Sequence, residues 1–374
     1  MSIKEVGVRF MFFIIFFTIY LLGNAYIIYR IMHDLKLHGI ALAVFITFYL
    51  VITFLSVYSF KISRFNEPTL SAKILTEIGY VWLGTFSIAL SYLLVSHLAF
   101  IFGHTPKFRY NTTLITVILI LASVVYSYIN NLGDPKVKEI DIHVSNLPVE
   151  KLSIVHLSDI HVDVTTNYNT IKRFVEITNS LNPDVIMFTG DLADTDITKT
   201  YEKYGLLDLK SKYGTFAVSG NHEYYRGITK YENLCEKLNF KLLNNENVLV
   251  DDKFYVAGIP DYKTSRAFNY KPADINKSLE GIDFNKPVIF LSHQPNPFFE
   301  SQKFPITIQL SGHTHAGQIP PFDIIEYFLY KYFWGLYKDS DSYIYVTAGT
   351  RLWGPPMRLF SKSEIVKINL MQKL

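Results

Sequence analysis

Five short clusters of aspartate, asparagine and histidine lie between residues 158 and 315 of this 374-residue sequence, each directly after a short apolar run. Carboxylate oxygens, amide oxygens and imidazole nitrogens suit divalent ions such as Mn, Fe, Zn or Mg, whereas soft-metal sites use thiolates. The residue types therefore indicate a metal site. The clusters are Ser-Asp-Ile-His at 158–161, Thr-Gly-Asp-Leu-Ala-Asp at 189–194, Gly-Asn-His-Glu at 220–223, Ser-His at 292–293 and Gly-His-Thr-His at 312–315.

The spacing inside the clusters favours convergence of their side chains. Asp159 and His161 are two residues apart, as are His313 and His315, so an extended segment projects each pair to the same side. Glycines in three of the clusters permit tight turns close to a metal or a phosphate. One such motif alone is usually a turn or a hydrogen-bonded residue, but five in order favour a shared functional site.

Short runs rich in β-branched and aromatic residues predict the strands that position these clusters. Strands that alternate with helices and hairpins predict a layered α/β domain over residues 134–374. Ligands bind beyond the carboxyl ends of strands in such sheets, so the five clusters can meet at one site. We expect strands at residues 154–157, 185–188, 215–218, 254–257, 288–291, 306–310 and 343–346, and helices at 169–181 and 230–238. His156, inside the first strand, is expected to be a hydrogen-bonded core residue.

The first 133 residues differ in composition and predict a transmembrane region of four helices. Each of four uncharged apolar runs has 20 or more residues, enough for a helix to cross about 30 Å of hydrocarbon. Only 18% of the whole chain is charged, against about 25% in typical soluble proteins. A multi-pass protein of the cell membrane is therefore expected. The predicted spans are residues 10–29, 39–60, 79–102 and 111–133.

Basic residues near the spans favour a cytoplasmic second half. Four spans place both ends of the chain on one side, and seven basic residues there face four on the other side, which the positive-inside rule associates with the cytoplasm. The seven are Lys4, Arg9, Lys61, Arg64, Lys73, Lys136 and Lys138, and the four are Arg30, Lys36, Lys107 and Arg109. A net charge of +3 is too small to indicate nucleic acid as a partner, and the single cysteine, Cys235, excludes an intramolecular disulfide.

The ordered set Asp-Ile-His, Gly-Asp, Gly-Asn-His-Glu, His and Gly-His-Thr-His resembles the calcineurin-like metallophosphoesterases over residues from about 150 to 370. The Gly-Gln after the last cluster and the late Gly-Thr-Arg-Leu-Trp-Gly-Pro-Pro at 349–356 are similar to the bacterial membrane-associated branch. The resemblance implies an α/β (α+β) fold of four layers, two mixed sheets packed together and flanked by helices, with a dinuclear metal site. The transmembrane region lies outside the resemblance.

The resemblance also implies which residues would bind two divalent cations. One cation would be held by Asp159, His161, Asp191 and His315, and the other by Asp191, Asn221, His293 and His313. Two cations about 3.5–4 Å apart lower the pKa of a bound water and neutralise phosphoryl oxygens. The implied reaction is hydrolysis of a phosphate ester or phosphoanhydride by hydroxide, in line with the leaving oxygen.

Two further residues have implied catalytic roles. His222 resembles the family's histidine that binds no metal and stabilises charge or protonates the leaving group. Asp194 matches a carboxylate that orients this imidazole in some branches, although capping of a helix or turn is an equally good interpretation. Thr195 and Asp196 stand where the protein Ser/Thr phosphatases of the superfamily carry a phosphate-binding arginine, which disfavours a phosphoprotein substrate.

Residues 319–337 are rich in aromatic side chains and allow two interpretations. They could form an insertion packed on the domain, or a lip at the membrane interface, where aromatic rings are favoured. The lip would admit a lipid-linked phosphate or pyrophosphate.

Other functions stay open from the sequence. The domain could bind metal without turnover, as a membrane sensor, transporter or scaffold, or it could hydrolyse a cyclic nucleotide. Transport needs polar residues within the spans, which offer only Asn24, His97 and a few serines and threonines.

Overall fold

The computed structural model describes residues 3–62 and 69–373, with backbone alone for residues 3–13. It divides into two compact units, and the chain passes from one to the other between Leu132 and Gly133. The helix unit consists of Met1–Leu132, Gln318–Ile324 and Gly354–Phe360, and the sheet unit of Gly133–Gly317, Ile325–Trp353 and Ser361–Leu374. Two short segments of the second half of the chain therefore belong to the helix unit.

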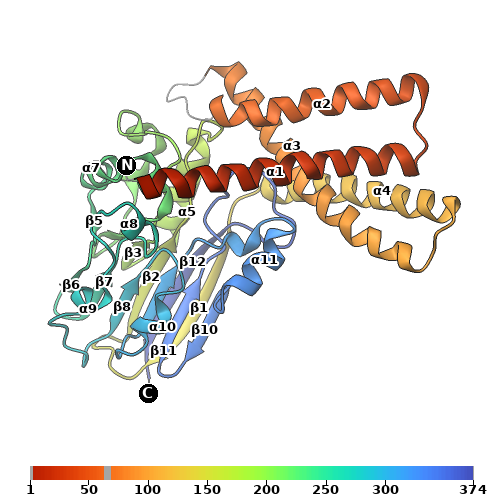
Figure 1. Ribbon diagram of the computed structural model, residues 1–374. Helices are drawn as coiled ribbons and strands as arrows, with labels where there is room; N and C mark the ends of the chain where they lie inside the picture. Colours follow the sequence, from red (N-terminus) through yellow and green to blue (C-terminus); the bar gives the residue numbers. More distant parts are fainter. Residues whose placement is uncertain (1–2, 63–68, 374) are drawn as a thin grey trace. The chain divides into compact units, whose positions relative to one another are not determined.

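Four long helices make up the helix unit, and each is long and apolar enough to cross a membrane. They are α1 (Ile3–Asp34), α2 (Gly39–Ile62), α3 (Leu70–Leu98) and α4 (Pro106–Asn131) (Figure 1). Their presence confirms the four predicted spans. The helices α3 and α4 begin earlier than the apolar runs because Thr69 and Thr105 cap them. Their hydroxyl oxygens accept hydrogen bonds from the backbone N–H groups of Ala72 at 3.3 Å and Phe108 at 3.2 Å.

A buried ion-pair network lengthens α1 beyond the predicted end at residue 29. The guanidinium of Arg30 is fully buried and donates hydrogen bonds to Asp34 at 2.8 Å and to Thr113 at 3.1 Å. Arg109 donates to the same carboxylate at 3.1 Å. A charge is tolerated in an apolar helix when it is paired in this way. Arg30 and Arg109 are therefore both ion-paired with Asp34 rather than unpaired charges in a loop.

Three of the basic residues used to predict the topology have no described side chain. Arg64 lies outside the described residues, and Lys4 and Arg9 lie where only the backbone is described.

Two six-stranded mixed sheets make up the core of the sheet unit (Figure 1). The first has the order β1 (Lys136–Val144), β12 (Glu364–Gln372), β2 (Lys151–Leu157), β3 (Val185–Phe188), β4 (Thr215–Ala217) and β5 (Phe240–Leu242). The second has the order β10 (Gly335–Asp339), β11 (Ser342–Val346), β9 (Ile308–Ser311), β8 (Val288–Leu291), β7 (Phe254–Gly258) and β6 (Glu246–Val250). The strands β2 to β5 are mutually parallel, as are β11, β9, β8 and β7.

The two sheets pack face to face, and helices cover their outer faces. Ile154 and Met187 of the first sheet share one buried apolar cluster with Val256 and Leu310 of the second. The helices α5 (Tyr168–Ser180) and α7 (Ile228–Lys237) pack on the other face of the first sheet. Around the second sheet lie α9 (Ile275–Ser278) and α10 (Phe298–Ser301). The predicted four-layer architecture is confirmed. The remaining helices are α6 (Asn221–Arg226), α8 (Thr264–Ala267) and α11 (Phe322–Leu329), with short 3-10 turns at Ala99–Ile101, Tyr201–Tyr204, Leu206–Asp208 and His315–Gly317.

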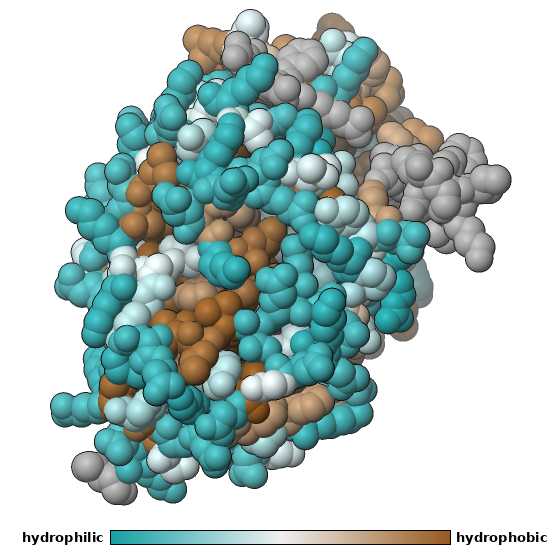
Figure 2. Space-filling view, turned by 90° about the vertical axis from the view of Figure 1, so that its left-hand side faces the viewer, coloured by the Kyte–Doolittle hydropathy of each residue, from teal (hydrophilic) through white to brown (hydrophobic). Residues whose placement is uncertain are grey.

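The two units differ in the side chains that they expose. The sheet unit carries ion pairs between exposed residues, such as Arg173 with Asp134 at 3.0 Å, and hydrophilic residues predominate on the face of the protein in Figure 2. The helix unit instead exposes large apolar side chains, among them Phe48 and Phe54. Exposed apolar side chains on long apolar helices are typical of a lipid-facing surface. The structure thus supports a membrane location.

Candidate metal centre

The predicted ligands stand where the central strands end. Each follows a member of the parallel strand sets, so the parallel order brings these strand ends to a common edge. Asp159 and His161 follow β2, Asp191 follows β3, Asn221 follows β4, His293 follows β8, and His313 and His315 follow β9.

Three of these side chains form a first group around a common point. Nε2 of His161 lies 3.2 Å from Nε2 of His315 and 3.8 Å from Oδ1 of Asp159. Nε2 of His315 lies 3.5 Å from the same oxygen. The side chains of Asp159 and His161 are buried, and that of His315 is nearly so. The group could hold one metal ion.

A second group lies beside the first. Nε2 of His293 is 3.2 Å from Oδ2 of Asp191, 3.1 Å from Oδ1 of Asn221 and 3.2 Å from Nδ1 of His313. Oδ2 of Asp191 is also 3.6 Å from Nε2 of His161 in the first group. One carboxylate oxygen therefore lies between the two groups, and the structure brings all seven predicted side chains together.

The donor set fits divalent cations. Two nitrogens bound to one cation at about 2.0–2.1 Å are roughly 3.0–3.4 Å apart, and both imidazole pairs show 3.2 Å. Nδ1 of His293 donates a hydrogen bond to the carbonyl oxygen of Thr189 at 2.7 Å. That bond keeps a proton on Nδ1 and orients the ring, so Nε2 is the atom available to a metal.

Buried carboxylates give the cluster a negative potential. Burial alone would raise the pKa of Asp191, but His293 and His222 beside it hold that pKa well below its usual range. Burial lowers the pKa of His293, yet the Asp191 and Asp159 carboxylates overcome this effect and raise it to about 10. The cluster therefore attracts positive charge, and a divalent cation would displace protons from it.

Glycines allow the carboxylates to approach the backbone closely. A Cβ atom at Gly312 would lie 2.1 Å from Oδ2 of Asp159, and one at Gly220 would lie 2.2 Å from Oδ1 of Asp191. Both distances are impossible for real atoms. Asp159 and Asp191 themselves have φ of 54° and 55°, a sparsely populated conformation that concentrates at functional sites.

The side chain of His222 pairs with Asp194, and its ring lies 4.7 Å from that of His161. Nδ1 of His222 lies 2.5 Å from Oδ1 of Asp194, and the same oxygen is 3.3 Å from Nδ1 of His161. The backbone N–H of His222 donates to Oδ1 of Asp191 at 2.9 Å. Of the two interpretations of Asp194, the geometry favours orientation of the imidazole over capping.

Three aromatic side chains outside the predicted ligand set frame the cluster. The rings of Tyr225 and Trp353 lie 5.4 Å and 5.5 Å from that of His222, and Tyr330 lies 5.8 Å from His313. Tyr225 and Trp353 are about half exposed, so they are available to contact a substrate beside His222.

His156 is a core residue, as predicted. Its Nε2 lies 2.8 Å from Oγ1 of Thr189 inside the sheet, and burial lowers its pKa to about 3. It is therefore neutral and outside the cluster.

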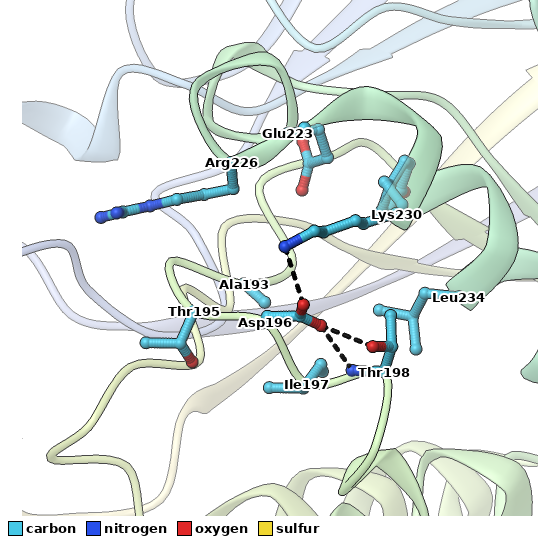
Figure 3. Close-up of a pocket in the computed structure, with 11 residues that line it drawn as sticks. Ala193, Thr195, Asp196, Ile197, Thr198, Glu223, Arg226, Lys230 and Leu234 are labelled. Atoms are coloured by element: carbon cyan, nitrogen blue, oxygen red, sulfur yellow. Dashed lines mark hydrogen bonds and ion pairs between the residues drawn. The ribbon is translucent and has the colours of Figure 1, made fainter. Parts of the chain in front are cut away.

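A pocket behind the Asp194 loop contains none of the seven ligand residues (Figure 3). Within it, Nζ of Lys230 lies 2.8 Å from Asp196, and the Thr198 hydroxyl donates to the same carboxylate at 2.6 Å. These bonds lower the pKa of Asp196 to about 2. Asp196 thus holds the loop in place through its bonds to Lys230 and Thr198.

Glu223, the last residue of the cluster at 220–223, was assigned no role from the sequence, and it supports the predicted ligands through the backbone. Its carboxylate accepts hydrogen bonds from the backbone N–H groups of Asp191 at 3.0 Å, Leu192 at 2.8 Å and Gly220 at 2.7 Å. Glu223→Ala would leave three buried donors unpaired, and each costs about 1–3 kcal/mol. We expect a loss of at least about 3 kcal/mol in the free energy of unfolding of the sheet unit.

Thermal and denaturant unfolding, followed by intrinsic fluorescence, would measure this loss. The matched control is Glu176→Ala, which removes an exposed ion pair with Arg173 and should cost less than about 1 kcal/mol. Equal effects of the two substitutions would contradict the supporting role of Glu223.

Comparison with known proteins identifies the family. Residues 152–317 match the family described as calcineurin-like phosphoesterase. An uncharacterized metallophosphoesterase of Campylobacter jejuni is 32% identical over 382 residues, which cover 97% of this chain and 100% of that protein. The chain belongs to the metallophosphoesterase family. Its similarity to the Campylobacter protein includes the helical region that precedes the family match.

Two other relatives are similar over a shorter range. A transmembrane protein with metallophosphoesterase domain from Danio rerio is 34% identical over 278 residues, covering 70% of this chain and 63% of that protein. An uncharacterized metallophosphoesterase of Helicobacter pylori is 37% identical over 249 residues, covering 66% of each chain. This metallophosphoesterase therefore spans slightly less than two thirds of the length of these two relatives.

Proposed function

We propose that this metallophosphoesterase is a membrane-anchored hydrolase that cleaves a phosphate ester or phosphoanhydride with two divalent cations, Mn, Fe, Zn or Mg. The observation that carries the proposal is the convergence of donors on Asp191, whose Oδ2 lies 3.2 Å from His293 and 3.6 Å from His161. The neighbouring pair of His222 and Asp194 supports turnover. A domain that only binds metal, as a sensor, transporter or scaffold would, has no need of that pair.

The two groups of donors would each hold one cation. The first cation would be bound by Asp159, His161, Asp191 and His315, and the second by Asp191, Asn221, His293 and His313. Asp191 would bridge them, because its oxygen lies between the groups and its negative charge reduces repulsion between the cations.

Bound cations would lower the pKa of a water molecule and neutralise phosphoryl oxygens. The residues around them would complete the reaction. Protonated His222, held at Nδ1 by Asp194 at 2.5 Å, would donate its Nε2 proton to the leaving oxygen as the phosphorus–oxygen bond breaks. The attacking water supplies the new phosphorus–oxygen bond and loses one proton, so each turnover consumes one water. The imidazole then regains a proton from solvent.

A lipid-linked phosphate or pyrophosphate, such as a nucleotide-diphospho-lipid, is the substrate class that we favour. Four candidate spans anchor the chain. Gln318, three residues after the predicted ligand His315, and Gly354, directly after Trp353, both belong to the helix unit. The segments that follow the site in the chain are therefore part of the membrane anchor, which supports a substrate presented by the membrane.

The sheet unit is proposed to face the cytoplasm from the cell membrane. The excess of basic residues on the side of both chain ends supports this orientation.

A substrate panel tests the function directly. Detergent-solubilised protein, supplied in turn with Mn²⁺, Fe²⁺, Zn²⁺ and Mg²⁺, would be assayed with lipid pyrophosphates, soluble monoesters, diesters and cyclic nucleotides. We expect hydrolysis that EDTA abolishes and re-added metal restores, fastest with a lipid pyrophosphate. No hydrolysis with any metal would contradict the enzyme assignment, and a preference for cyclic nucleotides would contradict the lipid substrate alone.

A further inference from the structure

The helix α11 exposes an unusual amount of apolar surface. None of its eight residues is buried, and its large apolar side chains have exposed fractions from 43% to 79%. Contiguous apolar surface of this kind marks a site of interaction with a protein or a membrane. The exposed residues are Phe322, Ile324, Ile325, Tyr327, Phe328 and Leu329.

The acidic residues of α11 point the other way. Asp323 and Glu326 are partly buried, and each has a carboxylate oxygen that is shielded from solvent and has no hydrogen-bond partner among the described residues. Burial raises the pKa of Glu326 to about 7, against the effect of nearby Lys263. A helix on a water-exposed surface has its charged side outward and its apolar side inward. The polarity of α11 is reversed.

The chain that leads into α11 packs on a candidate membrane span. Pro320 accepts a hydrogen bond through its carbonyl oxygen from the hydroxyl of Ser87 on α3 at 2.6 Å. Ile319 and Met357 pack against Ile88 of the same helix. A Cβ atom at Gly84 would lie 2.6 Å from the sulfur of Met357 and 3.0 Å from Cβ of Pro355, so a larger residue would force this packing to shift. The first residues of α11, up to Ile324, belong to the helix unit.

We infer that α11 lies in the membrane interface, with its apolar face among the acyl chains of the bilayer. The first turn of α11 belongs to the helix unit, and amphipathic helices with aromatic residues on the apolar face are favoured at the membrane interface. The bilayer, rather than a second copy of the chain, is the occupant because α11 begins in the helix unit, whose spans expose large apolar side chains of the lipid-facing kind.

A consequence for the substrate follows, and it rests on the proposed function. Tyr330 comes directly after α11, and its ring lies 5.8 Å from that of the predicted ligand His313. Lys263 lies 5.8 Å from the same Tyr330 ring. An interfacial α11 would thus connect the lipid surface to the rim of the metal cluster, with a lysine available to an anionic headgroup.

Depth-dependent quenching tests the position of α11 without reference to activity. The buried Cys235 would be replaced by alanine, and a single cysteine at Phe328 labelled with an environment-sensitive fluorophore in the full chain in phospholipid nanodiscs. The matched control is a cysteine at Leu249 on β6, which is also an exposed apolar residue. A second variant carries the label at Leu329, another exposed residue of α11, so that a local folding defect at one position does not decide the result.

Labels at 328 and 329 should be quenched by lipids that carry a nitroxide in the acyl chain, and iodide should quench them several-fold less than the label at 249. Equal access of iodide to all three positions would overturn the inference. Protection from iodide without quenching by the nitroxide lipid would also overturn it, because a protein surface would then cover α11. Neither of these two results would bear on the proposed function, because metal-dependent hydrolysis is measured separately.

Discussion

Asp191→Asn should reduce metal-dependent hydrolysis by more than about 100-fold. Loss of a residue that only hydrogen-bonds to a metal ligand typically costs up to about 100-fold, and loss of a residue that binds both cations should cost more. The reason is that one oxygen of Asp191 lies 3.2 Å from His293 and 3.6 Å from His161. Its neutral replacement would weaken both proposed cation positions at once. Turnover and bound metal, measured by elemental analysis after gel filtration, should fall together.

Asp196→Asn is the matched control for this substitution. It makes the same chemical change on the same loop, but its carboxylate is held by Lys230 and Thr198 and faces a pocket without ligand residues. It should retain metal and most of the activity. Full metal content in Asp191→Asn, or equal loss in both variants, would contradict the bridging role.

His222→Ala should lower turnover by about 10²–10⁴-fold for an ester with a poor leaving group, the usual contribution of a general acid. The loss should be much smaller for a p-nitrophenyl ester, because p-nitrophenolate leaves without a proton. Metal content should be unchanged, since His222 is not among the seven proposed ligands. Asp194→Asn should give a smaller loss with the same dependence on the leaving group, because it only disturbs the orientation of the imidazole.

The alternative for His222 is a metal ligand, because His161, Asp194 and His222 could together hold an ion. In that case His222→Ala would lose metal and would slow both esters equally. This outcome would require a different assignment of the first cation position.

The seven clustered residues could be predicted from the sequence because their chemistry and their position coincide. Asp159 and His313 lie more than 150 residues apart in the chain, yet each directly follows a short apolar run. Such runs become central parallel strands, whose ends share one edge of the sheet. The four spans were equally predictable, because long uncharged runs are rare outside membranes.

The residues to which the sequence analysis assigned no role at the site act through contacts that only the fold creates. Trp353 and Tyr225 belong to different segments, and their common neighbour His222 cannot be read from local spacing. Among the strands, β1, β5, β6, β10 and β12 were not predicted. The run Lys-Val-Lys-Glu-Ile-Asp-Ile-His-Val of β1 alternates polar and apolar residues, as a half-exposed strand does, and only continuous apolar runs were expected to form strands.

Residues 319–337 follow neither of the two predicted alternatives as a whole. Tyr330 and Tyr332 are buried, and the indole N–H of Trp334 donates to Glu364 at 3.3 Å, so this part packs on the sheet unit. Phe328 is 79% exposed on α11. Composition alone could not separate the two parts, because the same aromatic residues serve in a core and at a membrane interface.

Anomalous diffraction from crystals soaked in Mn²⁺ tests the central claim most directly. Two peaks, about 3.5–4 Å apart as in other two-metal sites, should lie on either side of Asp191, one beside His161 and His315 and the other beside His293 and His313. A single peak between these groups, or no peak near the seven side chains, would contradict the account.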